Sequence, residues 1–233
     1  MAHEFYCVSC GSSLSQYRAN TPVRDFYSAP CQETFQLKAS STTIGNKIMG
    51  ANFEKFRQSI LGSSQPSLIL LHYDQPNWLV KDLSIIHRAC ITLSCIERRN
   101  PLKETARRPG WVGCNIILNA IPKLGQIEVV NDGRIMDKRA VTEQWKRISG
   151  LLQWGPIRRG WLADVLRCVE RLDTTFTIRD AYTFESELAS KHRDNHNIRA
   201  KIRQQLQVLR DLGIIEFVIP GVYRHIQKPQ LQR

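Results

Sequence analysis

A glycine-proline break, Gln153-Trp154-Gly155-Pro156-Ile157, divides the chain into two parts with different patterns. Proline fixes its own backbone geometry and lacks an amide donor, so a helix does not continue through this segment. Beyond it, apolar residues recur at every third or fourth position from Trp161 onward, as on one buried face of a helix. The pattern predicts two domains, 1–154 and 155–233, with a helical start to the second.

Two further helices are predicted in the second domain. Thr177 stands three residues before Asp180, so the two side chains can cap the start of a helix whose apolar positions extend to Leu188. Another helix, over 198–212, places Ile and Leu inward and ends before Gly213.

The segments 214–218 and 222–226 are typical of two strands, and Pro220-Gly221 between them predicts a hairpin. Three helices followed by a hairpin are the layout of a winged helix, whose third helix enters the major groove of DNA. Long polar side chains stand near the start of that helix, where they could contact DNA: Asn197, Arg199, Lys201, Arg203 and Gln204. A solvated helix face is the alternative interpretation.

The charge agrees with a polyanionic partner. Lys and Arg number 33 against 21 Asp and Glu, which gives a formal net charge of +12. The odd number of cysteines, the lack of a leader pattern at the start and the lack of a long apolar run predict a cytoplasmic protein that does not bind membranes.

A possible zinc knuckle lies at the start of the first domain. Cys7 and Cys10 have the two-residue gap with which two thiolates grip one Zn²⁺. Cys31 follows about twenty residues later, but Ser28 stands where a fourth cysteine would be expected. Three cysteines could bind zinc, with His3 as a candidate fourth ligand, or all three could be unliganded.

Asp25 and Gln36-Leu37-Lys38 form a second pattern. Residues 34–38 alternate like a strand, so Gln36 and Lys38 project to one face. We expect Asp25 at the end of the preceding strand, where its carboxylate would meet them. Asp25 could then hold Mg²⁺ with the amide oxygen of Gln36, and Lys38 could orient the attacking water.

A second carboxylate would be the usual partner of Asp25, and Gln36 supplies a neutral amide instead. The loss of one charge should weaken Mg²⁺ binding. Glu33 is three positions from Gln36 and points to the opposite face of an alternating strand, so we do not expect it to substitute.

The whole chain resembles the DpnI family, also called Dam-replacing proteins, over nearly all of residues 5–226. The motifs that carry the resemblance are Cys7-x2-Cys10, Pro22-Val23-Arg24-Asp25-Phe26-Tyr27, Gln36-Leu37-Lys38, 105–116, 184–188 and 201–211. The resemblance implies an α/β (α+β) fold, in which a PD-(D/E)xK nuclease core with a zinc-knuckle-like insertion precedes a winged helix. Proteins of that family cut DNA at GATC sites carrying N6-methyladenine, and the resemblance implies that the winged helix also recognises this methylated site. It assigns Asp25 and Lys38 to catalysis, whereas the family carries Glu in place of Gln36 and a four-cysteine zinc site where this chain has Ser28.

The segment Arg107-Arg108-Pro109-Gly110-Trp111 combines two guanidinium groups with a broad indole ring. Arginine contacts DNA phosphates, and an indole can pack on a base step or on a methyl group. With the resemblance we favour methyl sensing by Trp111; on the residues alone, a half-buried core tryptophan is the favoured interpretation.

The resemblance, taken with these residues, implies a monomeric endonuclease that cuts double-stranded DNA at GATC sites carrying N6-methyladenine, with catalytic Mg²⁺ and structural Zn²⁺. Two alternatives remain open. The chain could bind methylated DNA without cutting it, or it could be an ordinary winged-helix transcription regulator.

Overall fold

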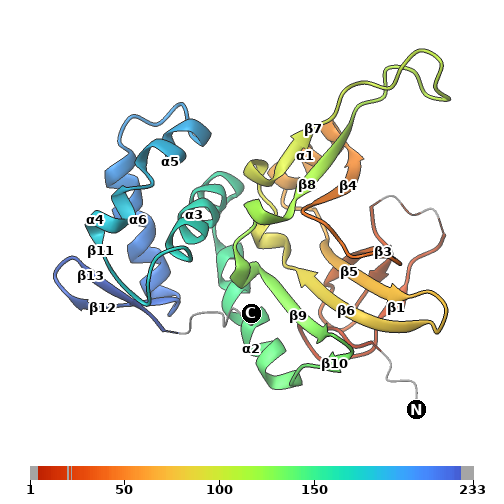
Figure 1. The fold of residues 1–233 in the computed structure, drawn as a ribbon, viewed down its shortest axis with the longest axis horizontal. Coiled ribbons are helices and arrows are strands. Elements are labelled where there is room, and N and C mark those ends of the chain that lie inside the picture. The colour runs from red at the N-terminus through yellow and green to blue at the C-terminus, as the bar shows by residue number, and fades with distance from the viewer. Residues whose placement is uncertain (1–4, 20, 22, 227–233) are drawn as a thin grey trace.

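Residues 5–19, 21 and 23–226 are described here from a computed structural model (Figure 1). Residues 5–153 build two β-sheets with helices against them, and residues 156–226 build a smaller sheet with four helices. No helix in these described ranges is both long and apolar enough to cross a lipid bilayer.

The larger sheet has seven strands in the order β1-β2-β3-β5-β6-β9-β10. Parallel pairing joins β3 to β5, and the other neighbours are antiparallel. Alternating apolar residues, such as Phe35, Leu68 and Ile127, are fully buried in its core. The strands are β1 (Ser15–Gln16), β2 (Phe26–Tyr27), β3 (Thr34–Ser40), β5 (Ser67–Asp74), β6 (Leu79–Ile86), β9 (Gln126–Asn131) and β10 (Arg134–Ile135).

A three-stranded sheet and helix α1 belong to the same part of the chain as the larger sheet, and the segment from β4 to α1 links β3 to β5. The strands β4 (Lys47–Asn52), β8 (Gly113–Ile117) and β7 (Ile96–Arg98) pair antiparallel in that order. Helix α1 (Phe53–Leu61) follows β4 directly, and its N-cap residue Asn52 accepts a hydrogen bond from the Lys55 amide at 3.1 Å. The chain between β7 and β8 projects far from the rest of the molecule (Figure 1).

Helix α2 (Lys138–Ser149) packs against the larger sheet through Trp145. The Trp145 ring contacts the rings of Phe35 and His87, with centroids 6.0 and 4.2 Å away. Burial lowers the pKa of His87 to about 3, so this imidazole is a neutral core residue. Five short 3-10 helices complete this part: η1 (Arg88–Cys90), η2 (Leu93–Cys95), η3 (Leu118–Ala120), η4 (Lys123–Gly125) and η5 (Gly150–Gln153).

The C-terminal part confirms the predicted winged-helix layout. Its sheet has the order β11-β13-β12, and Gly221 makes the wing turn at a positive φ of 78°. The strand β11 was not predicted, because three residues beside a helix cap carry too weak a pattern. The elements are α3 (Pro156–Val169), β11 (Thr175–Thr177), α4 (Ile178–Tyr182), α5 (Glu185–Lys191), α6 (Ile198–Asp211), β12 (Ile215–Ile219) and β13 (Val222–His225).

The prediction of one continuous helix from Thr177 to Leu188 is wrong. The cap between Thr177 and Asp180 is present, but the helix stops at Tyr182 and a new one starts at Glu185. The break places Phe184 against the core, where the Arg171 guanidinium stacks on its ring at 4.6 Å. The packing of Phe184 against the core therefore accompanies the break between α4 and α5.

Helix α3 is buried on most of its sides rather than on one, which corrects the predicted single buried face. It lies between the two parts of the molecule (Figure 1). The Arg159 guanidinium donates to Ser63 Oγ at 3.0 Å, and the Glu170 carboxylate accepts from the Lys123 and Leu124 amides at 2.8 and 2.9 Å. Polar contacts thus fasten α3 to the N-terminal part.

Candidate active site

Asp25 lies one residue before the Phe26–Phe35 pair with which the antiparallel pairing of β2 and β3 begins. The Asp25 amide donates to the Phe35 carbonyl at 2.9 Å. The Leu37 amide donates to Asp25 Oδ2 at 2.7 Å, which fixes the carboxylate against β3. The Asp25 carboxylate therefore lies beside β3 at Leu37, whose chain neighbours are Gln36 and Lys38.

Asp25 stands just before β2 and not at the end of a strand, which corrects the predicted position. The reason is that β2 and β3 are joined by the turn after Tyr27, so the chain enters the hairpin at Asp25. Within the predicted site, the structure shows the bond from the Leu37 amide to the Asp25 carboxylate and an electrostatic interaction between Asp25 and Lys38.

Lys38 lies two positions beyond Gln36, on the same side of β3. Burial lowers the pKa of Lys38 below its ordinary value, while the charges of Asp25 and Cys114 oppose this effect. Lys38 therefore gives up a proton more readily than an exposed lysine does.

The residues of this site fit a Mg²⁺ ion with few protein ligands. Mg²⁺ in nucleases and polymerases is held by one or two carboxylates together with substrate phosphate and water. Asp25 supplies one carboxylate, and Gln36 supplies a neutral oxygen. Glu33 is engaged elsewhere, since its carboxylate accepts from Arg88 Nε at 3.3 Å.

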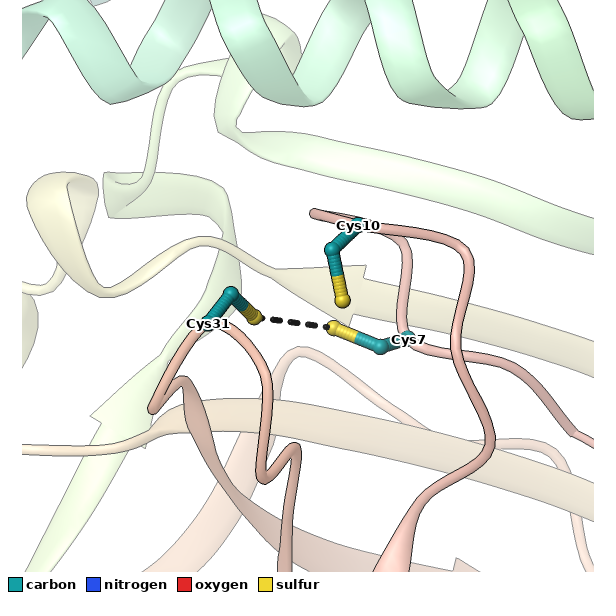
Figure 2. Close-up of side chains that lie close together, drawn as sticks. All are labelled: Cys7, Cys10 and Cys31. Atoms are coloured by element: carbon teal, nitrogen blue, oxygen red, sulfur yellow. Dashed lines mark hydrogen bonds between the residues drawn. The ribbon is translucent and has the colours of Figure 1, made fainter.

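Cys7, Cys10 and Cys31 converge in a second cluster, with their sulfur atoms within 4.8 Å of one another (Figure 2). Cys7 Sγ and Cys31 Sγ are 3.6 Å apart. Two thiolates on one tetrahedral Zn²⁺ at about 2.3 Å would be separated by roughly 3.8 Å, so the cluster fits zinc. Among the residues with described structure, this is the one group of three or more Cys, His, Asp or Glu able to share an ion.

Ser28 occupies the fourth corner of the cluster. Its buried hydroxyl lies 3.2 Å from Cys10 Sγ and 3.0 Å from Ser12 Oγ. His3, the other candidate for a fourth ligand, lies outside the described residues. A zinc ion here would have three protein sulfurs and one oxygen-lined position.

The cysteines differ in their readiness to ionise. Burial raises the pKa of Cys7 to about 12. Slight burial opposes ionisation of Cys10, but hydrogen bonds from the hydroxyls of Ser12 and Ser28 outweigh it and lower its pKa to about 6. Cys10 is therefore the thiolate to which a cation would first be attracted.

The knuckle is also part of the protein core. Cys7 and Val8 are fully buried, and the Lys138 ammonium of α2 lies 4.6 Å from the centre of the Tyr6 ring. Gly11 closes the knuckle turn at a φ of 79°, and its amide donates to the Cys7 carbonyl at 2.7 Å. Apolar packing thus holds this segment in addition to any metal.

The projecting chain between β7 and β8 carries Arg107 and Arg108, both exposed. Neither forms an ion pair within the part of the chain that the structure describes. Trp111 is half-buried at the base of this projection, and its ring covers Gly113 so closely that a Cβ there would be 2.7 Å from it. The arginines and the indole are therefore separated along the projection.

The predicted polar face of α6 is exposed, but several of its side chains already have partners. Arg199 Nε donates to Glu185 at 2.7 Å, Arg203 to the Tyr182 hydroxyl at 2.5 Å, and Lys201 to Gln204 at 2.8 Å. Asn197 is exposed at the helix start, and its side chain makes no capping bond. Sequence reasoning missed Tyr182 and Glu185, because the break between α4 and α5 is what places both beside α6.

Family models cover both parts of the chain. The DpnI model, described as the Dam-replacing family, matches residues 1–153, and the Dam-replacing HTH domain matches residues 157–225. The first match alone spans more than half of the chain. The protein therefore belongs to the DpnI, or Dam-replacing, family, and its C-terminal part is that family's helix-turn-helix domain.

Proposed function

We propose that this protein is an endonuclease that hydrolyses double-stranded DNA at GATC sites carrying N6-methyladenine. The observation that carries the proposal is the bond from the Leu37 amide to the Asp25 carboxylate, because Leu37 stands between Gln36 and Lys38 on β3. Family membership supports nuclease activity in general, and the helix-turn-helix domain supports DNA as the partner.

Asp25 and Gln36 would hold Mg²⁺. When bound, Mg²⁺ would supply charge neutralisation at the phosphate and a water of lowered pKa. The bond from the Leu37 amide keeps the Asp25 carboxylate in place and leaves its second oxygen for the ligand. The neutral amide makes this site weaker than one with two carboxylates.

Lys38 would orient the attacking water and take up its proton. Its lowered pKa increases the neutral fraction that can accept a proton near neutral pH. The substitution Lys38→Ala removes this group while Asp25 and Gln36 remain.

DNA recognition would be shared by two surfaces. Arg107 and Arg108 would contact phosphates, and Trp111 would contact the adenine methyl group. The exposed side of α6, with Asn197, Arg199, Lys201, Arg203 and Gln204, would face the major groove in the winged-helix manner. Zn²⁺ held by Cys7, Cys10 and Cys31 would stabilise the segment that precedes Asp25.

A second function is favoured by one observation. Gln36 is neutral and Glu33 is bound to Arg88, so Asp25 is the one free carboxylate among the described residues that we considered as ligands. In this alternative, the protein binds methylated GATC sites and occupies them without cutting.

A plasmid assay separates the two. Dam-methylated and unmethylated plasmids are incubated with protein and Mg²⁺ or Mn²⁺, beside the variants Gln36→Glu and Lys38→Ala. Cleavage of methylated plasmid that disappears in Lys38→Ala supports the nuclease. Retarded but intact methylated DNA, with cleavage appearing in Gln36→Glu, supports the binder. Binding that ignores methylation and selects another sequence contradicts both and indicates a transcription regulator.

A further inference from the structure

A cavity of about 330 Å³ lies beside the segment that precedes Asp25. It is formed by Thr21, Val23 and Arg24 together with α1 and the segment that follows α1. Its described lining contains two basic side chains and no acidic one: Thr21, Val23, Arg24, Lys55, Phe56, Ser59, Ser64 and Pro66. The composition favours an anionic ligand.

Positive charge around this cavity exceeds the negative charge available to neutralise it. Three guanidiniums meet at one turn: Arg24 donates to the Ser64 carbonyl at 3.4 Å, Arg88 to the Ser63 carbonyl at 3.5 Å, and Arg159 to Ser63 Oγ at 3.0 Å. Within the described ranges, Glu33 is the carboxylate that pairs with any of them, through Arg88. Lys55 adds a further cation to the lining.

Arg24 retains most of its hydrogen-bonding capacity. A guanidinium has five N–H donors, and the single bond from Arg24 to the Ser64 carbonyl uses one of them. The hydroxyls of Thr21 and Ser59 already donate to backbone carbonyls, so the two cations are the main donors that face a ligand. Such a pair is suited to a phosphate group.

The position of the cavity connects the candidate active site with Trp111. Arg24 adjoins Asp25 along the chain, and successive Cα atoms are about 3.8 Å apart. Lys55 stands in the first turn of α1. The side-chain amide of Asn52, the N-cap residue of that helix, donates to the Val112 carbonyl at 3.2 Å, and Val112 directly follows Trp111. DNA that reaches both Asp25 and Trp111 would pass this cavity.

We propose that Arg24 and Lys55 bind a backbone phosphate of the DNA strand, within a few nucleotides of the bond to be cut. The site holds the strand in register for Asp25 and Lys38 without reading the sequence. This inference rests on the proposed function, since it takes the same DNA as its ligand.

The test measures binding of a labelled methylated GATC duplex to the full chain without divalent metal, as a function of salt concentration. Arg24→Ala and Lys55→Ala are compared with Lys146→Ala, whose exposed side chain lies on α2, a helix that does not line the cavity. We expect each of the first two variants to reduce the slope of log K against log salt by about 0.9, equally for methylated and unmethylated DNA. The control should keep the wild-type slope.

A second arm identifies the phosphate. Neutral methylphosphonate linkages are placed one at a time beside the cut position, and one position should weaken binding by wild type but not by the Arg24→Ala, Lys55→Ala double variant. Wild-type slopes in both single variants, with unfolding midpoints unchanged, would overturn the inference, as would inorganic phosphate binding at this cavity without any effect on DNA affinity. If the wild type itself does not bind the duplex, the proposed function has failed instead.

Discussion

The buried carboxylate of Asp164 on α3 accepts a hydrogen bond of 2.6 Å from the hydroxyl of Ser94 on η2, which joins the helix-turn-helix domain to the N-terminal part. The same carboxylate binds Lys191 Nζ at 2.8 Å and His192 Nε2 at 2.9 Å. The His192 ring stacks on Trp161 with centroids 3.7 Å apart. One carboxylate thus connects η2, α3 and the end of α5.

Replacement of Asp164 should destabilise the whole chain. Asp164→Asn leaves the half-buried Lys191 ammonium without a charged partner, and we expect the free energy of unfolding in urea to fall by about 3 kcal/mol. Ser94→Ala should cost about 1 kcal/mol, because it removes one hydrogen bond. The control Asp211→Asn changes an exposed pair with Arg210 and should have almost no effect. Equal stability of Asp164→Asn and the control would contradict this role.

His87 should make stability depend on pH below neutrality. Its folded-state pKa of about 3 lies below the ordinary histidine value, so the unfolded chain binds a proton that the folded chain does not. The stability that neutral His87 contributes is fully present above pH ~6.5. It is lost as the pH falls from 6.5 towards 3, and the free energy of unfolding then decreases by up to about 1.4 kcal/mol per pH unit.

The measurement is urea unfolding between pH 4.5 and 7.5 for wild type and His87→Gln. The variant is expected to be less stable at pH 7.5, with a shallower dependence on pH. Parallel curves for the two proteins would show that His87 does not cause the dependence.

A fourth cysteine should convert the knuckle into a tight zinc site. Ser28→Cys places a sulfur at the corner now occupied by a hydroxyl 3.2 Å from Cys10 Sγ, and four thiolates are a common structural zinc set. We expect about one zinc per chain after dialysis against a mild chelator, and a higher unfolding temperature with zinc than without. Ser13→Cys, exposed in the same segment, is the control and should retain no more zinc than wild type. Equal zinc retention by the two variants would contradict the geometry of the cluster.

The position of the Trp111 ring should control methyl discrimination. Gly113→Ala introduces a Cβ about 2.7 Å from that ring, so the ring must move. We expect the ratio of affinities for methylated and unmethylated GATC duplexes to fall towards that of Trp111→Ala, while affinity for unmethylated DNA changes little. Trp111 fluorescence transfer to a labelled duplex would report the displacement. A retained ratio in both variants would exclude Trp111 as the methyl sensor.

Local patterns predicted much of the fold. The alternation at 34–38 predicts β3, and the capping box of Thr177 and Asp180 predicts the start of α4. Pro220-Gly221 predicts the turn of the wing. Each depends on neighbours in the chain. The apolar sequence around Cys90, Cys95, Cys114 and Cys168 is likewise typical of buried small side chains, and all four are buried.

Features set by distant contacts were not predictable in this way. The burial of α3 on most sides comes from its place between the two parts of the molecule, and Arg159 and Glu170 are polar residues that find backbone or hydroxyl partners there. The contact of the Asp25 carboxylate with the Leu37 amide depends on how β2 pairs with β3, and the local sequence pattern does not determine that register. The assignment of catalytic roles and the domain division at 154–155 stay predictions.

The dependence of cleavage on Mg²⁺ tests most directly whether the carboxylate of Asp25 and the amide of Gln36 suffice to bind the catalytic metal ion. Initial rates on Dam-methylated plasmid are measured over a range of Mg²⁺ concentrations for wild type and Gln36→Glu, with Lys38→Ala as the inactive control. The account predicts that wild type cuts the methylated plasmid and that Gln36→Glu reaches half its maximal rate at a lower Mg²⁺ concentration, because the restored charge strengthens binding. Methylated plasmid left intact by the wild type at every Mg²⁺ concentration, while Gln36→Glu cuts it, would contradict the account.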